Sequence, residues 1–293
     1  MTRPRRETAT ARSRHSSDAA DSGRRRTPRR RFGQHFLAPP WADKVAAAID
    51  PRPADRFLEI GPGPGVLTAR LASRAAHVTA VEIDRDLASD LRRTAPPNVE
   101  IVEADVLELD LAALVANGPL RIAGNLPYNI SSPILFKLLR VAAASPNAID
   151  ATVMLQREVA DRLAAAPGTK DYGVLTIFTA AQADVTRLLT LPPGAFRPPP
   201  RVNSSVVRLT FKPPMVPAEL AGTFERMVKT MFMQRRKTLA NALRPFADAA
   251  GVPAGVALSA AMIDPMRRPE TLAMRELLAL AGAFRAQALG PKA

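Results

Sequence analysis

The residues best suited to chemistry lie where successive apolar segments of the chain end. Residues 58–65 read L-E-I-G-P-G-P-G, so a glycine-rich turn with the spacing G-x-G-x-G follows one segment. Glu82 closes the next segment, and Asp105 follows the one after it. Glycines let a backbone approach a ligand closely, and a carboxylate at such a place can accept hydrogen bonds from ribose hydroxyls. A carboxylate can equally accept a hydrogen bond from the amino group of adenine. Together these features indicate a site for a cofactor that contains adenosine.

The glycine spacing distinguishes two such cofactors. A dinucleotide fingerprint requires G-x-G-x-x-G, which holds a pyrophosphate at a helix N-terminus, and this chain lacks that spacing. S-adenosylmethionine (SAM) therefore fits better than NAD. Each acid taken alone could be a solvated carboxylate, but the three features in order favour the cofactor site. The predicted contacts are Gly61, Gly63, Glu82, Ile83, Asp105 and Val106.

A further motif, Asn125-Leu126-Pro127-Tyr128, ends the fourth apolar segment. The side-chain oxygen of Asn125 and the main-chain carbonyl of Leu126 or Pro127 can accept the hydrogens of an exocyclic amine. Such acceptors draw the nitrogen towards the sp³ geometry that attack on a sulfonium methyl requires, and proline orients them in advance. Tyr128 offers a face on which a base can stack. The motif therefore places a polar amide, a proline and an aromatic residue in the same cleft as the expected cofactor.

Strands that alternate with helices must position these residues. This alternation predicts an α/β fold, in which a Rossmann-like parallel sheet carries helices on both faces. Two later strands, 187–191 and 205–211, are expected to form an antiparallel edge. The earlier expected strands are 56–60, 77–83, 99–103, 120–124 and 151–155, with helices from the glycine turn to about 74, over 84–93 and over 132–141. The helices expected after residue 217 are 218–233, 236–249, 259–263 and 269–288.

Charge divides the chain into three parts. Residues 1–31 hold 11 Arg, three acids and no Leu, Ile, Val or Phe, which predicts a disordered arginine-rich tail. Residues 32–213 are nearly neutral and are predicted to form the SAM-binding domain. Residues 214–293 are basic and predict a small all-helical domain that binds RNA. With a net charge of +14 concentrated at both ends, nucleic acid is the expected partner, although a solvated charge run would also explain the tail.

The composition excludes several other classes of protein. The chain has no Cys and only three His, which lie far apart, so a disulfide scaffold, a thiol nucleophile and a metal site are not expected. No apolar run approaches the about 20 residues that a membrane helix needs, and the start has no apolar signal region. We therefore expect a cytoplasmic protein with no membrane association.

The longer motifs resemble the rRNA adenine dimethyltransferases, a family of SAM-dependent N6-adenine methyltransferases. The similarity covers about residues 31–280 and includes the segments RFGQHFL, EIGPGPGVLT, VEIDRDL, GNLPYNISSPILFKLL, MLQREVADRL, KDYG, FRPPPRVNSSVVRL, QRRKTL and RPETL. The resemblance is greatest to the bacterial group that acts on the small ribosomal subunit. It implies N6,N6-dimethylation of two adjacent adenosines in the 3′-terminal hairpin loop of 16S rRNA. It also implies a monomer that contacts the immature subunit and contributes to ribosome biogenesis.

The resemblance assigns roles to further residues. It places Phe196 on the other face of the target base, and it places Gln34, His35 and Leu37 over the cofactor, which Asn125 also touches. Phe196 taken alone could instead pack in the core. The residues that the resemblance and the charge pattern assign to RNA are Arg29, Arg30, Arg31, Arg201, Arg235, Arg236 and Lys237, the last three at the start of a helix.

Three alternatives remain beside this hypothesis. His35 stands where the small-subunit group carries Asn, and His is common there in the Erm group, which methylates one adenine of 23S rRNA and confers macrolide resistance. The NLPYNISSP and QRRKTL segments favour the small-subunit group. An assembly factor that mainly binds rRNA is the alternative from another class. A mitochondrial-type transcription factor is disfavoured because the start lacks an amphipathic transit segment.

Overall fold

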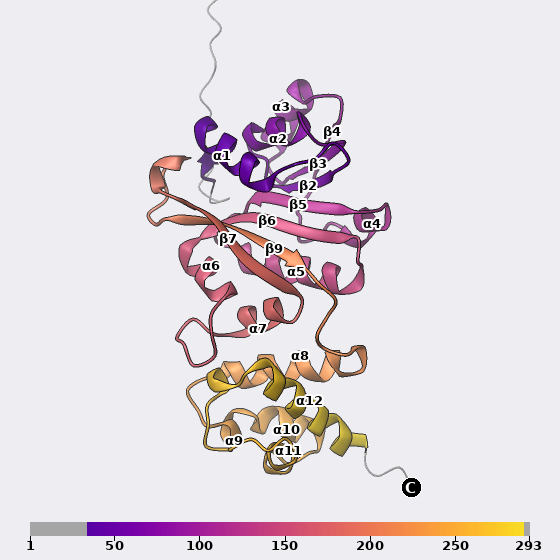
Figure 1. Ribbon diagram of the computed structural model, residues 1–293, viewed down its shortest axis with the longest axis vertical. Coiled ribbons are helices and arrows are strands. Elements are labelled where there is room, and N and C mark those ends of the chain that lie inside the picture. The colour runs from indigo at the N-terminus through magenta and orange to yellow at the C-terminus, as the bar shows by residue number, and fades with distance from the viewer. Residues whose placement is uncertain (1–33, 290–293) are drawn as a thin grey trace, which may run out of the picture.

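The computed structural model describes residues 34–289, which form a sheet flanked by helices and followed by a helical region (Figure 1). The seven strands lie in the order β4-β3-β2-β5-β6-β9-β7. Neighbours from β4 to β6 are parallel, whereas β9 runs antiparallel to both β6 and β7. The expected α/β fold with an antiparallel edge is therefore confirmed. The strands are β2 (Arg56–Ile60), β3 (His77–Glu82), β4 (Val99–Glu103), β5 (Leu120–Asn125), β6 (Ala148–Gln156), β7 (Ala183–Leu191) and β9 (Ser204–Phe211).

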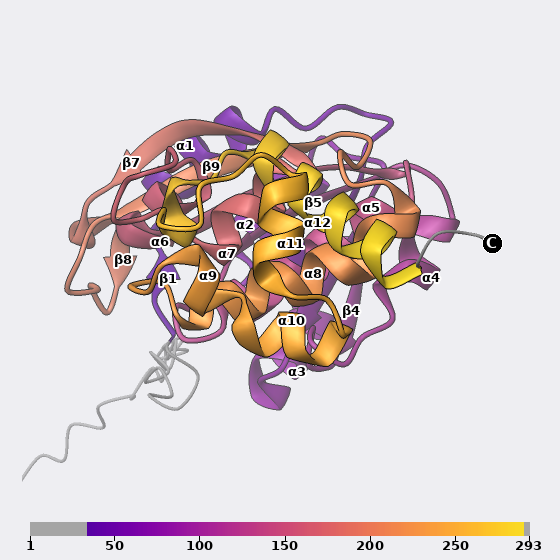
Figure 2. The same ribbon diagram turned by 90° about the horizontal axis from the view of Figure 1, so that it is seen from below.

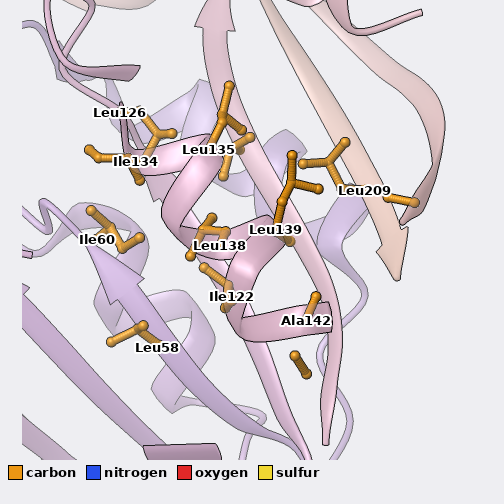
Figure 3. Close-up of a cluster of buried hydrophobic side chains, with 14 of the residues drawn as sticks. Leu58, Ile60, Ile122, Leu126, Ile134, Leu135, Leu138, Leu139, Ala142 and Leu209 are labelled. Atoms are coloured by element: carbon orange, nitrogen blue, oxygen red, sulfur yellow. The ribbon is translucent and has the colours of Figure 1, made fainter. Parts of the chain in front are cut away.

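Helices cover both faces of the sheet because the side chains of each central strand alternate between two apolar clusters. Phe57 of β2 packs with α1 (Pro39–Ile49) and α2 (Val66–Ala72). Its neighbour Leu58 packs on the opposite face, mainly against α5 (Ser131–Ala144) (Figure 3). Strands buried on both faces read as continuous apolar runs, which is why they were recognisable in the sequence. The remaining helices of this part are α3 (Arg85–Thr94), α4 (Leu111–Ala116), α6 (Arg157–Leu163) and α7 (Val174–Ala180).

A second, two-stranded sheet joins segments that are far apart in the sequence. The strand β1 (Phe36–Leu37) pairs antiparallel with β8 (Phe196–Arg197), which follows a 3₁₀ turn over Pro193–Ala195. The register sets Leu37 opposite Phe196. This pairing holds the first described residues against the proline-rich loop and beside the main sheet.

The helices after the sheet gather around their own apolar cluster (Figures 1 and 2). Helix α8 has the expected bounds, but the single helix expected over 236–249 is wrong. Pro245 supplies no backbone N–H, and a separate helix begins at Arg244 with this proline in its first turn. The helix expected over 259–263 lies earlier and ends at Ala260, before Met262 with φ +56°. The last helix begins at Met274, after a 3₁₀ turn over Pro269–Thr271. The helices are α8 (Ala218–Met233), α9 (Leu239–Ala242), α10 (Arg244–Ala250), α11 (Ala254–Ala260) and α12 (Met274–Leu289).

Two earlier residues, Tyr172 and Ile177, belong to the same cluster as these helices. The Tyr172 hydroxyl donates to the carbonyl of Leu272 at 2.8 Å. The apolar core of the helical part thus includes residues that precede the predicted domain boundary between 213 and 214. That boundary stays a prediction. Within residues 34–289, no helix has the length and hydropathy that crossing a bilayer would demand.

Candidate functional site

A cavity of about 270 Å³ opens at the carboxyl edge of the sheet. It lies where the chain turns from β2 to β3 on one side of the sheet and later returns to β5 on the other. Such a switch in strand order leaves a crevice outside the strand ends, which is the usual ligand site of open α/β sheets. The predicted residues in its wall are Gln34, His35, Gly61, Gly63, Glu82, Ile83, Asp105, Val106, Asn125, Leu126, Pro127 and Tyr128.

The glycine turn after β2 forms the floor of this cavity. Gly61 and Gly63 have φ of +67° and +57°, a region that side chains with a Cβ rarely adopt. A Cβ on Gly63 would also lie only 2.9 Å from the ring of Phe36. The glycines are therefore required both by the backbone conformation and by the close packing of β1 over the turn.

Glu82 fixes the position of this turn. Its Oε2 accepts a hydrogen bond from the backbone N–H of Gly63 at 3.0 Å, and its Oε1 accepts one from Asp84 at 2.9 Å. Burial raises the pKa of Glu82, and these two hydrogen bonds oppose that rise. A carboxylate has about four acceptor sites, so Glu82 keeps acceptor capacity for a ligand.

Asp105 lies in a tight loop directly after β4. Its Oδ1 accepts from the N–H of Leu107 at 2.8 Å, which orients the carboxylate. Its main-chain carbonyl accepts from Glu108 and Leu109, both at 3.0 Å. Beside it, Ile83 is 45% exposed in the cavity wall, where an apolar side chain can cover the face of a planar ring.

Asn125 ends β5 next to the glycine turn. Its Nδ2 donates to the main-chain carbonyl of His35 at 2.6 Å, whereas its buried Oδ1 has no hydrogen-bond partner among residues 34–289. Leaving a buried acceptor unpaired costs about 1–3 kcal/mol, so this oxygen is suited to receive a donor from a ligand. The strand approaches β2 closely here, because a Cβ on Gly124 would lie 2.4 Å from the Ile60 carbonyl oxygen.

Tyr128 lies in the turn between β5 and α5. Its hydroxyl forms a 2.7 Å hydrogen bond with Ser204, and burial raises its pKa, so the phenol stays neutral. The His35 ring stacks on it with centroids 5.4 Å apart and planes inclined by 26°. His35 is held in turn by Nδ1, which donates to the Pro198 carbonyl at 2.8 Å. One aromatic face of the site is thus built from His35 and Tyr128 together.

Leu37 and Phe196 are predicted site residues that the structure places elsewhere. Both side chains are buried, Phe196 completely, in the cluster formed by α1, α2 and the sheet. Neither lines the cavity, although Leu37 borders a smaller hollow behind it. In this structure the Phe196 side chain lies in that core and not in the cavity wall, so its role as a stacking face stays a prediction.

The residues predicted to bind RNA are distributed over three regions. Arg29, Arg30 and Arg31 lie outside the described residues. Arg201 is exposed in the loop between β8 and β9, and Arg236 and Lys237 are exposed between α8 and α9. The expectation that Arg235 begins a helix is wrong, since residues 234–238 form a turn in which its side chain donates to the carbonyls of Thr169 and Lys170.

Gly124 and Ser204 also contribute to the site, although neither was predicted from the sequence. A glycine inside a strand is a signal for the close approach of another backbone, so Gly124 could have been found. Ser204 had no local signal, because its contact with Tyr128 spans 76 residues.

Comparisons with known proteins agree with this arrangement. Residues 25–260 match the model of a family described as ribosomal RNA adenine dimethylase. A ribosomal RNA small subunit methyltransferase A from Methylibium petroleiphilum is 48% identical over 258 residues, which are 86% of this chain and 95% of that protein. A protein of the same name from Xanthomonas euvesicatoria pv. vesicatoria is 44% identical over 254 residues, covering 85% and 94%.

Two solved structures have similar folds over most of the chain. A dimethyladenosine transferase from Plasmodium falciparum has a TM-score of 0.67 and 26% identity, and the match covers 84% of this chain and 96% of that one. A 23S rRNA methyltransferase, ErmE, has a TM-score of 0.61 and 28% identity, covering 86% and 100%.

Proposed function

The chain belongs to the ribosomal RNA adenine dimethylase family, and from that premise we propose that it uses SAM to dimethylate adenine N6 in 16S rRNA. The targets we propose are two adjacent adenosines in the 3′-terminal hairpin loop. The observation that carries the chemistry is the buried Asn125 Oδ1, which has no hydrogen-bond partner among residues 34–289 and lies in the wall of a cavity that also contains Glu82 and Asp105. The names of the small-subunit methyltransferases that resemble this chain support 16S rRNA as the substrate.

The residues in the cavity fit SAM by their donor and acceptor chemistry. Glu82 would accept both ribose hydroxyls, and Asp105 Oδ2 would accept the adenine amino group, because Oδ1 already holds the Leu107 N–H. Ile83 and Val106 would cover the adenine ring. When bound, SAM supplies an electrophilic methyl group.

The protein's own contribution is to hold the target amine. Asn125 Oδ1 accepts one amine hydrogen, and the main-chain carbonyl of Leu126 or Pro127 accepts the other, so the nitrogen lone pair is directed at the methyl group. These acceptors are oriented before the substrate arrives, since Asn125 is fixed through His35 and the turn is closed by a 3.1 Å hydrogen bond from Ile130 to Pro127. The proton leaves after methyl transfer, so no strong base is required.

The target base needs an aromatic surface and access to it. Stacking on Tyr128 contributes about 1–3 kcal/mol per base. A base within a helix must leave its stack to reach such a cavity, which favours adenosines in a loop. The exposed Arg201, Arg236 and Lys237 would contact phosphates of the immature small subunit. The enzyme would act on that subunit as a monomer in the cytoplasm, as a step of ribosome biogenesis.

His35 supports one alternative, methylation of 23S rRNA by an Erm-type activity, since it departs from the small-subunit motif. Substrate choice separates the two. Purified protein and labelled SAM are incubated with unmethylated small subunits and, separately, with large subunits or free 23S rRNA. Two dimethyladenosines at the 3′ end of 16S rRNA support the proposal, whereas label confined to 23S rRNA supports the alternative.

A further inference from the structure

Lys137 holds the loop that follows β4 from the side of helix α5. Its Nζ donates to the main-chain carbonyls of Leu107 and Leu109, each at 2.6 Å. Both acceptors are main-chain oxygens of the same loop. One ammonium therefore fixes two carbonyls that lie two residues apart, which restrains the path of the loop between them.

The same loop carries Asp105. The Asp105 side chain is oriented by the Leu107 N–H at 2.8 Å, so the residue that orients the carboxylate is also one that Lys137 binds through its carbonyl. The Leu109 N–H returns to the Asp105 carbonyl at 3.0 Å, and the Leu109 carbonyl receives the second bond from Lys137. A displacement of the Leu107 or Leu109 carbonyl therefore also moves the N–H groups of these residues that bind Asp105.

The helix that carries Lys137 begins at the proposed target-base site. Ser131 Oγ donates to the Tyr128 carbonyl at 3.3 Å, and Ile134, one turn before Lys137, lines the cavity. Helix α5 is closely packed here, since Leu135 and Leu138, which flank Lys137 in the sequence, are completely buried. Lys137 thus connects the loop that bears Asp105 to the helix that follows Tyr128.

We propose that Lys137 is a positioning residue for adenine recognition: through the 105–109 loop it holds the Asp105 carboxylate where it accepts the adenine amino group of the cofactor. This inference rests on the proposed function, because it concerns how that site reads adenine. Hydrogen bonds from a charged donor contribute about 1.5–3 kcal/mol each, so two of them are sufficient to keep the loop in one conformation.

The test compares two ligands that differ at the group Asp105 would read. S-adenosylhomocysteine carries an amino group at C6, and S-inosylhomocysteine carries an oxygen there. We expect wild-type protein to prefer the adenine ligand in calorimetry. Lys137→Met should weaken binding of S-adenosylhomocysteine about tenfold, the equivalent of one lost hydrogen bond of about 1.4 kcal/mol, and should leave S-inosylhomocysteine nearly unaffected. The KM for SAM should rise while kcat and the KM for RNA change less than about twofold.

Two further variants separate positioning from general support of the fold. Lys137→Arg retains donors for both carbonyls and should preserve the preference for adenine. Arg140→Met removes a cation from the same helix, where Arg140 is exposed and pairs with Glu225 at 3.2 Å, and should leave both affinities unchanged. In an Asp105→Ala background, Lys137→Met should have little further effect, because its influence passes through Asp105.

Equal weakening of both ligands by Lys137→Met would overturn the inference, as would additive effects of the Asp105 and Lys137 changes. Those results would leave the cofactor assignment standing if wild-type protein still prefers adenine. A wild-type protein that binds both ligands equally would overturn the assignment of Asp105 itself, and the role of Lys137 with it.

Discussion

Glu59→Gln should remove the part of the pH dependence of folding stability that the Glu59 carboxyl contributes. Glu59 lies on β2 just before the glycine turn and is 1% exposed. Burial raises the pKa of its carboxyl from 4.5 to about 7; the nearby Thr68 hydroxyl opposes this rise, and the Glu82 carboxylate adds to it. The folded protein therefore favours the neutral form. The stabilisation is complete below the unfolded pKa and is lost as pH rises through about 7.

The size of this effect follows from the two pKa values. The difference between 4.5 and about 7 corresponds to about 3 kcal/mol of unfolding free energy. Ionisation of Glu59 lowers the stability of the wild type by this amount between acid and alkaline solution. Glutamine has the same shape and cannot ionise. Glu59→Gln should therefore lie within about 1 kcal/mol of the wild type at pH 5 and exceed its stability by about 3 kcal/mol at pH 8.5.

Urea unfolding at these two pH values measures the difference directly. Glu158→Gln is the matched control, because Glu158 is exposed on α6 and pairs with Arg162, so its replacement should shift the two curves similarly. If the difference between wild type and Glu59→Gln is the same at pH 5 and pH 8.5, the Glu59 carboxyl does not titrate as the burial implies and the reasoning fails.

Three further changes test other parts of the account. Glu82→Ala should reduce SAM affinity by roughly 100-fold in calorimetry with the fold intact by circular dichroism, since it removes the acceptor for both ribose hydroxyls; unchanged affinity would contradict the ribose assignment. Gly124→Ala should lower stability by about 1–3 kcal/mol, because its Cβ would meet the Ile60 carbonyl oxygen at 2.4 Å. Gly222→Ala on α8, where a Cβ meets nothing within 4 Å, should not destabilise the protein. Deleting residues 1–31 should reduce the log–log salt slope of RNA binding by ~0.7–0.9 per lost phosphate contact without moving the methylated adenosines; an unchanged slope would show that the tail does not contact RNA.

The sheet could be predicted from the sequence because its strands are buried on both faces and end in polar residues. Glu82 and Asn125 follow apolar runs, and parallel strands bring such ends to one edge. Their clustering in one cavity followed from that topology alone. Pairing between β1 and β8 could not be predicted, because each strand has two residues and their contact spans about 160 positions.

The side-chain positions that could not be predicted from the sequence depend on tertiary packing. The motif around Phe196 shows an aromatic residue in a proline-rich loop, but its burial follows from the pairing of β8 with β1. Arg235 was expected at the start of a helix; its contacts with the Thr169 and Lys170 carbonyls occur in a turn instead. Lys137 gave no signal, since a lysine on an amphipathic helix normally faces solvent.

The central claim is that Asn125 holds the target amine in the cavity at the sheet edge. Its most direct test is a single-turnover assay of N6,N6-dimethyladenosine formation with unmethylated small ribosomal subunits and Asn125→Ala protein. Loss of one such oriented acceptor should slow methyl transfer by about 10²–10³-fold, while SAM and RNA binding stay within about twofold of wild type. Methyl transfer at close to the wild-type rate would contradict the claim.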